Sequence, residues 1–223
     1  MFKKVFADEN DKSSSLCLLD YILGITVQDV TILNSEIISF NFYNKGTTVD
    51  LIVKLENGTV VSIDMNTNTG TFIIIRNVFY LTKIMSKDLD SNKSYIDLHK
   101  HIQINFDTKR KHNKPIMKYS LIEEETHELL TDKLEIIRID VGYFKELCYT
   151  KDVRDLDLKT RLIGLVGIDN KELAENITNG DVNLEKIIKK VEEFSNQEEI
   201  IGAYDIERHR KMMAEAEKEE AKN

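Results

Sequence analysis

Apolar positions near the start of the chain recur at the spacing of a helix. Leu16, Leu19 and Ile22 are three residues apart, and Gly24 follows Leu23 directly. Residues at this spacing share one helix face, and a glycine commonly ends a helix, so the pattern predicts a helix that stops at Gly24. Segments rich in Ile, Val, Phe and Thr, separated by turn residues, follow and predict strands over residues 27–33, 36–43, 48–55 and 60–65.

The middle of the chain combines both periodicities. Helical spacing returns over residues 72–85, and apolar residues alternate with polar ones over residues 101–106. A further strand is predicted over residues 134–141. Pro115, the only proline, falls in a polar segment between these two strands, which we interpret as a loop.

The character of the chain changes after residue 150. Helical periodicity then predicts three helices, over residues 156–168, 171–177 and 184–194. We therefore expect a mixed α/β core over residues 1–150, followed by a helical region over residues 151–223.

Composition narrows the class of protein. The chain has 223 residues, of which 41% are hydrophobic and 31% are charged, as in ordinary globular proteins. No apolar run has the length of a membrane span, and the opening Met-Phe-Lys-Lys leads into polar residues rather than a signal peptide. Cys17 and Cys148 lie far apart in mostly apolar surroundings, so we expect buried free thiols in a cytoplasmic protein without membrane contact.

Charge bears on nucleic-acid binding. The formal net charge of −8 argues against a protein that coats nucleic acid without specificity. It does not exclude a nuclease, because acidic residues gather near the C-terminus, over residues 215–220. A basic cluster covers residues 109–118, and a solvated loop is the favoured interpretation over contact with DNA.

The most informative segment is a hairpin around Asn57-Gly58, which lies between two β-branched runs. A two-residue turn would place Asp50 and Asp64 on opposite faces of the sheet, with charged and apolar side chains mixed on both. A three-residue loop, with Gly58 in the left-handed bulge position, would instead place Asp50 directly across from Asp64. Burial favours the second register, because it collects a clean apolar face from Leu51, Val53, Leu55, Val61, Ile63 and Met65.

Two directly opposed carboxylates repel each other unless something compensates for their charge. Converging carboxylate oxygens suit Mg²⁺ or Mn²⁺, which prefer hard oxygen ligands. The alternative is that Asp50 and Asp64 splay apart on a solvated face. The register by itself leaves both interpretations open.

The order of these features resembles a known family. An aspartate at position 50, an apolar strand, the Asn57-Gly58 turn and a second strand ending in Asp64-Met65-Asn66 are similar to the PD-(D/E)XK superfamily, and to its recombination-promoting nucleases and transposases in particular. The similarity extends over most of the chain, through residues 2–6, 18–23, 76–80, 95–104 and 204–208.

This resemblance implies a restriction-endonuclease-like α/β fold, with a mixed central sheet flanked by helices and a C-terminal helical extension. It assigns Asp50 and Asp64 as metal ligands and Asn66 as the third catalytic position, which implies Mg²⁺-dependent or Mn²⁺-dependent cleavage of DNA. Two of these positions depart from the family pattern, which usually has Glu where this chain has Asp64, and Gln or Lys where it has Asn66.

Three further residues are accessory candidates. The resemblance suggests Glu9, the strand face shared with Asp50 suggests Lys54, and the spacing of one helical turn to Tyr80 suggests Arg76. Glu9 would add a metal ligand from the first helical segment, Lys54 would replace the missing lysine, and Arg76 would face DNA. The plainer alternatives are that Glu9 and Lys54 are exposed and that Arg76 holds a carboxylate while Tyr80 packs on the core. The rival function is a catalytically degenerate module that binds DNA or protein, and a homodimer formed through the last helices is a further hypothesis.

Overall fold

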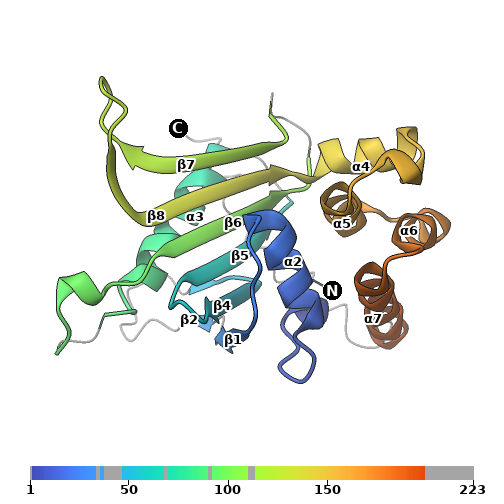
Figure 1. The fold of residues 1–223 in the computed structure, drawn as a ribbon, viewed down its shortest axis with the longest axis horizontal. Helices are drawn as coiled ribbons and strands as arrows, with labels where there is room; N and C mark the ends of the chain where they lie inside the picture. Colours follow the sequence, from blue (N-terminus) through green and yellow to red (C-terminus); the bar gives the residue numbers. More distant parts are fainter. Residues whose placement is uncertain are drawn as a thin grey trace, which may run out of the picture.

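The computed structural model describes residues 2–33, 36–37, 47–67, 70–89, 92–109 and 114–198. Its centre is a six-stranded sheet, and a two-stranded sheet lies beside it (Figure 1). In spatial order the large sheet consists of β1 (Val30–Leu33), β4 (Leu51–Leu55), β5 (Val60–Asn66), β6 (His101–Asp107), β8 (Leu129–Asp140) and β7 (Ile116–Ile122); the small sheet pairs β2 (Glu36–Ile37) with β3 (Thr47–Thr48).

The sheet is mixed. Strands β1, β4 and β5 are antiparallel neighbours, β5, β6 and β8 are parallel, and β7 returns antiparallel to β8. The connection between the parallel strands β5 and β6 contains α3 (Thr71–Met85), whereas the connection between β6 and β8 contains β7. The other helices are α1 (Phe2–Phe6), α2 (Ser13–Leu23), α4 (Val141–Thr150), α5 (Leu158–Gly167), α6 (Lys171–Thr178) and α7 (Val182–Glu198), with 3₁₀ turns η1 (Tyr95–Asp97) and η2 (Val153–Asp155).

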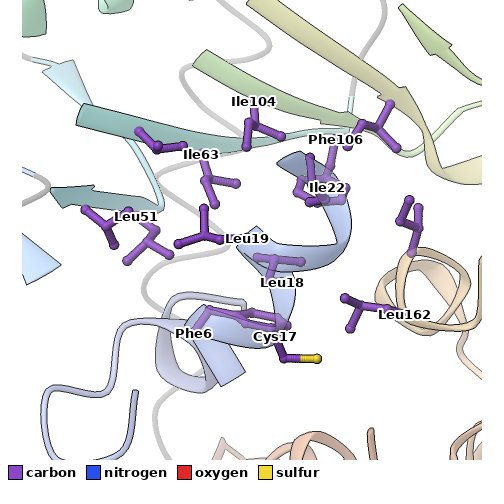
Figure 2. Packing of buried hydrophobic residues seen from close by; sticks show 14 of the residues in the cluster. Phe6, Cys17, Leu18, Leu19, Ile22, Leu51, Ile63, Ile104, Phe106 and Leu162 are labelled. Carbon is purple, nitrogen blue, oxygen red and sulfur yellow. The ribbon is translucent and has the colours of Figure 1, made fainter. Parts of the chain in front are cut away.

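One face of the sheet carries the main hydrophobic core. Helix α2 lies over this face, and its Leu19 and Ile22 lie between the helix and the strands, while Leu18 lies nearer Leu162 of the same core (Figure 2). The helix ends at Gly24, whose φ of 70° is a left-handed conformation that glycine adopts without steric cost. Side chains of α5 and α7 join the same core, so the helices after residue 150 pack with the strands in one cluster.

The opposite face is covered by α3. Ile52 and Val60 of the sheet are buried there with Tyr80 and Ile84 of the helix. Both faces of β6 are therefore covered, and all seven of its residues are buried. Its apolar residues face the main core, whereas its alternate residues are polar and lie on the α3 side: His101, Gln103, Asn105 and Asp107.

The fold class expected from the sequence is confirmed: helices flank a mixed sheet, and further helices follow toward the C-terminus. The expected strand over 48–55 is interrupted at Val49–Asp50, and most of the expected strand over 36–43 lies outside the described residues. The polar segment after Pro115 was wrongly interpreted as a loop, because it contains β7. No helix among the described residues is both long and apolar enough to cross a membrane.

Candidate functional site

The hairpin of β4 and β5 positions the first acid of the site. Its ladder pairs Leu51 with Ile63, and the Leu55 N–H donates to the Thr59 carbonyl at 2.9 Å, which leaves a three-residue loop. Gly58 in this loop has a φ of 85°, the left-handed bulge conformation. The expected register is therefore confirmed over these strands.

Asp50 lies one residue before this ladder. Its backbone N–H donates to the Ile63 carbonyl at 3.1 Å, and its Oδ2 accepts from the Met65 N–H at 2.8 Å. These bonds fix Asp50 at the end of β5 that carries Asp64. The carboxylate of Asp50 is close enough to Asp64 for its charge to raise the pKa of Asp64.

Asp64 is held by Arg76 of α3. The Arg76 Nη2 lies 2.6 Å from the Asp64 Oδ2 and 2.8 Å from the Asn66 Oδ1. The guanidinium also lies over the Tyr80 ring, one helical turn further on, at 5.4 Å from the ring centroid. This arrangement confirms the interpretation in which Arg76 holds a carboxylate while Tyr80 packs on the core.

Burial has the largest effect on the pKa of Asp64. Asp64 is only 6% exposed, and burial raises the pKa of its carboxyl to about 7, against the opposing effect of Arg76. The negative charges of Asp50 and Asp107 raise the pKa of Asp64 further. The site therefore concentrates negative charge in a region of low solvation, where a nearby cation stabilises it strongly.

The cluster of polar side chains around Asp64 continues across the sheet to β8. The Asn66 Nδ2 donates to the Asp107 Oδ1 at 2.9 Å, so both polar atoms of this buried amide have partners within the protein. The Asp107 Oδ2 accepts from the Arg138 Nε at 3.0 Å and lies 2.8 Å from the Arg138 Nη2. Sequence reasoning missed Asp107 and Arg138, although the polar residue at every second position of β6 was a usable signal.

The structure brings together Asp50, Asp64, Asn66 and Arg76, whereas two expected accessory residues lie elsewhere. Lys54 is four residues from Asp50, roughly 13 Å along the strand at about 3.3 Å per residue. Glu9 is exposed in the bend between α1 and α2, rather than in a helix. Within the described part of the chain, no hydrogen bond or ion pair joins Glu9 to the Asp64 group.

The donor set suits a hard divalent cation. Two carboxylates, from Asp50 and Asp64, and the amide oxygen of Asn66 are all oxygen donors, the type that Mg²⁺ and Mn²⁺ prefer. Among the described residues, no group of three or more His, Cys, Asp or Glu side chains could hold a metal ion. Protein ligation would therefore rest on two acids, and water would supply further ligands, as is usual for Mg²⁺.

Comparison with known proteins agrees with this geometry. Residues 1–221 match the family model described as the PD-(D/E)XK nuclease family transposase. Neither the curated proteins nor the solved structures contain a match to the chain. PD-(D/E)XK nucleases typically use divalent metal ions. Since the family model spans nearly the whole chain, the protein belongs to the PD-(D/E)XK nuclease family transposases.

Proposed function

We propose that this protein is a metal-dependent DNA endonuclease of the recombination-promoting type, which hydrolyses phosphodiester bonds. The observation that carries the proposal is the proximity of Asp50 and Asp64 at one end of β5, with Arg76 beside them. Paired acids next to a cationic side chain suit a phosphodiester, because the substrate is anionic and develops further charge during hydrolysis.

In this proposal Asp50 and Asp64 hold Mg²⁺ or Mn²⁺. The bound ion would lower the pKa of a coordinated water and offset charge on the phosphate. The carboxylate of Asp50 is already oriented by the Met65 N–H, and that of Asp64 by Arg76. Both side chains are therefore held before an ion binds, and the ion would have to share the Asp64 carboxylate with Arg76.

Asn66 has an orienting role in this proposal. An amide cannot take up a proton at neutral pH, so Asn66 is no general base. Its oxygen accepts from Arg76 and its nitrogen donates to Asp107. Arg76 supplies the positive charge at the position near which many relatives in the superfamily carry a lysine, and its planar guanidinium suits a phosphate.

The test is cleavage of supercoiled plasmid DNA in the presence of Mg²⁺ or Mn²⁺. We expect Asp50→Asn and Asp64→Asn to lower the rate by about a hundredfold or more, because either change removes an anionic ligand and displaces the ion. Asp132→Asn, at an exposed position of β8, is the matched control and should cleave like the wild type. Equal cleavage by all four proteins would refute the proposal.

A second function is a module that binds DNA without cleaving it. The observation that favours it is that Arg76 occupies the oxygens of both Asp64 and Asn66, while Asn66 is shorter than the usual Gln or Lys. This function requires DNA binding that persists in Asp50→Asn, with no cleavage by the wild type in either metal. If Asn66→Gln then cleaves DNA, the short Asn66 side chain was what prevented cleavage by the wild type.

A further inference from the structure

Strand β7 forms one edge of the large sheet. It pairs with β8 on its inner side, and no other described strand lies along its outer side (Figure 1). Most of its side chains are exposed, unlike those of the buried strand β6. An open edge of this kind exposes backbone groups that can pair with another strand.

The hydrogen-bonding register identifies which backbone groups point outward. The Asp140 N–H donates to the Pro115 carbonyl at 2.8 Å, so Pro115 and Asp140 form a hydrogen-bonded pair of the antiparallel ladder. Such pairs alternate with non-bonded pairs along two antiparallel strands. Met117 and Tyr119 therefore bond toward β8, whereas Lys118 and Ser120 direct their N–H and C=O groups to the outer side.

Beside Lys118, whose side chain is 57% exposed, the edge also carries exposed apolar side chains. Tyr119 is 46% exposed, and Leu121 and Ile122 of β7 are exposed to a similar degree. In the adjoining part of β8, Leu130 is 78% exposed. Contiguous exposed apolar side chains of this size commonly mark a contact with another protein.

The two ends of β7 carry opposite charges. Lys114 lies just before the strand, whereas Glu123, Glu124 and Glu125 lie just after it. Neither Lys114 nor Glu124 makes a salt bridge with another described residue. If a second copy ran antiparallel to the first, with Tyr119 at the centre, the end of β7 next to Lys114 in each copy would lie beside the end next to Glu124 in the other. The edge is therefore complementary to itself.

We propose that two copies of this chain associate through their β7 edges to form a homodimer with one continuous sheet. Antiparallel pairing about a two-fold axis gives both copies the same contacts and closes the assembly at two. Backbone hydrogen bonds from the outer edge join the strands, and the exposed apolar side chains flank them. This dimer does not use the C-terminal helices and does not depend on the proposed nuclease activity.

Ser120→Pro tests the pairing, with Ser120→Ala as the matched control. The proline removes an outward N–H and leaves the hydrogen bonds to β8 in place, so the variant should fold. Light scattering coupled to size-exclusion chromatography should give dimers for the wild type and Ser120→Ala at micromolar concentrations, and monomers for Ser120→Pro. A monomeric wild type, or a dimer that persists in folded Ser120→Pro, would overturn the proposal.

Charge exchange provides a second test, which applies even if Ser120→Pro does not fold. Lys114→Glu and Glu124→Lys should each raise the dimer dissociation constant roughly tenfold, because each places two like-charged pairs across the interface. The double variant Lys114→Glu/Glu124→Lys should restore the wild-type constant. Single variants that dimerise like the wild type, or a double variant without recovery, would contradict the antiparallel arrangement.

Discussion

The Nη2 of Arg76 lies 2.6 Å from the Oδ2 of Asp64, and this contact joins α3 to the polar face of the sheet. The same nitrogen also lies 2.8 Å from the Oδ1 of Asn66. One guanidinium thus compensates the buried acid and satisfies the neighbouring amide. Asp64 is one of the two proposed metal ligands, and Asn66 is the proposed orienting residue. Arg76 and a divalent cation would therefore compete for the side-chain oxygens of these two residues.

Arg76→Met should destabilise the protein by about 3 kcal/mol, because it leaves the Asp64 carboxylate buried without a cationic partner. Urea unfolding measures this loss. Mn²⁺ should then raise the melting temperature of Arg76→Met more than that of the wild type, since the competing guanidinium is gone. Arg76→Lys keeps a charge and should lie between the two. An equal Mn²⁺ effect on all three proteins would contradict competition at Asp64.

Gly58→Ala should destabilise the protein more than Gly24→Ala. Both glycines have a positive φ, so alanine at either position is strained by about 1 kcal/mol. A Cβ at Gly58 would also overlap the ring of His99, which Asp88 holds through a 2.8 Å contact, whereas nothing lies within 4 Å of a Cβ at Gly24. We therefore expect a total of about 3 kcal/mol at Gly58. If chemical denaturation gave equal losses of unfolding free energy for the two variants, the turn at Gly58 would have to accommodate the added Cβ by a small local shift.

Asp11→Asn should remove the ion pair between Asp11 and Lys190, which stabilises the fold and is lost when Asp11 is protonated at low pH. Lys190 of α7 lies 2.9 Å from the Asp11 carboxylate and, together with bonds from Ser13, lowers the pKa of Asp11 to about 2. Because this folded pKa is below the ordinary value of 3.8, the contribution is present above pH 3.8 and is lost as pH falls toward 2.

The effect of Asp11→Asn should be below about 1 kcal/mol, because the Asp11 carboxylate is partly exposed and its ion pair is screened by water. Unfolding free energies of wild type and variant should differ near neutral pH and converge as pH falls toward 2. Added salt should narrow the difference near neutral pH. A difference that widens in acid would show that the contact with Lys190 does not stabilise the fold.

Cys17 and Cys148 should be unreactive in the folded protein. Burial raises the pKa of the Cys17 thiol to about 12 and that of Cys148 to about 11, which suppresses the reactive thiolate at neutral pH. An aromatic disulfide reagent should therefore modify both thiols in denaturant and neither under native conditions. Glu172→Cys, at an exposed position of α6, is a control that should react at once. Fast native modification of Cys17 or Cys148 would show that the core opens readily.

The sequence alone determined the local features whose cause lies in neighbouring residues. Asn57-Gly58 and the apolar alternation on both sides of it set the hairpin register, because only a three-residue loop collects the apolar side chains on one face. The helical spacing that ends at Gly24 predicted α2 in the same way. Residue order also sufficed to recognise the family.

Tertiary structure alone decided which polar residues meet. Asp107 and Arg138 are 31 positions apart in sequence and become partners because β6 and β8 are parallel neighbours. The buried polar side of β6 depends on α3 covering the second face of the sheet, and an alternating pattern usually indicates one solvated face. Strand β7 also escaped recognition, because its exposed side chains leave no periodic pattern of burial. Burial and pairing with distant segments are properties of the folded chain, so local patterns could not reveal them.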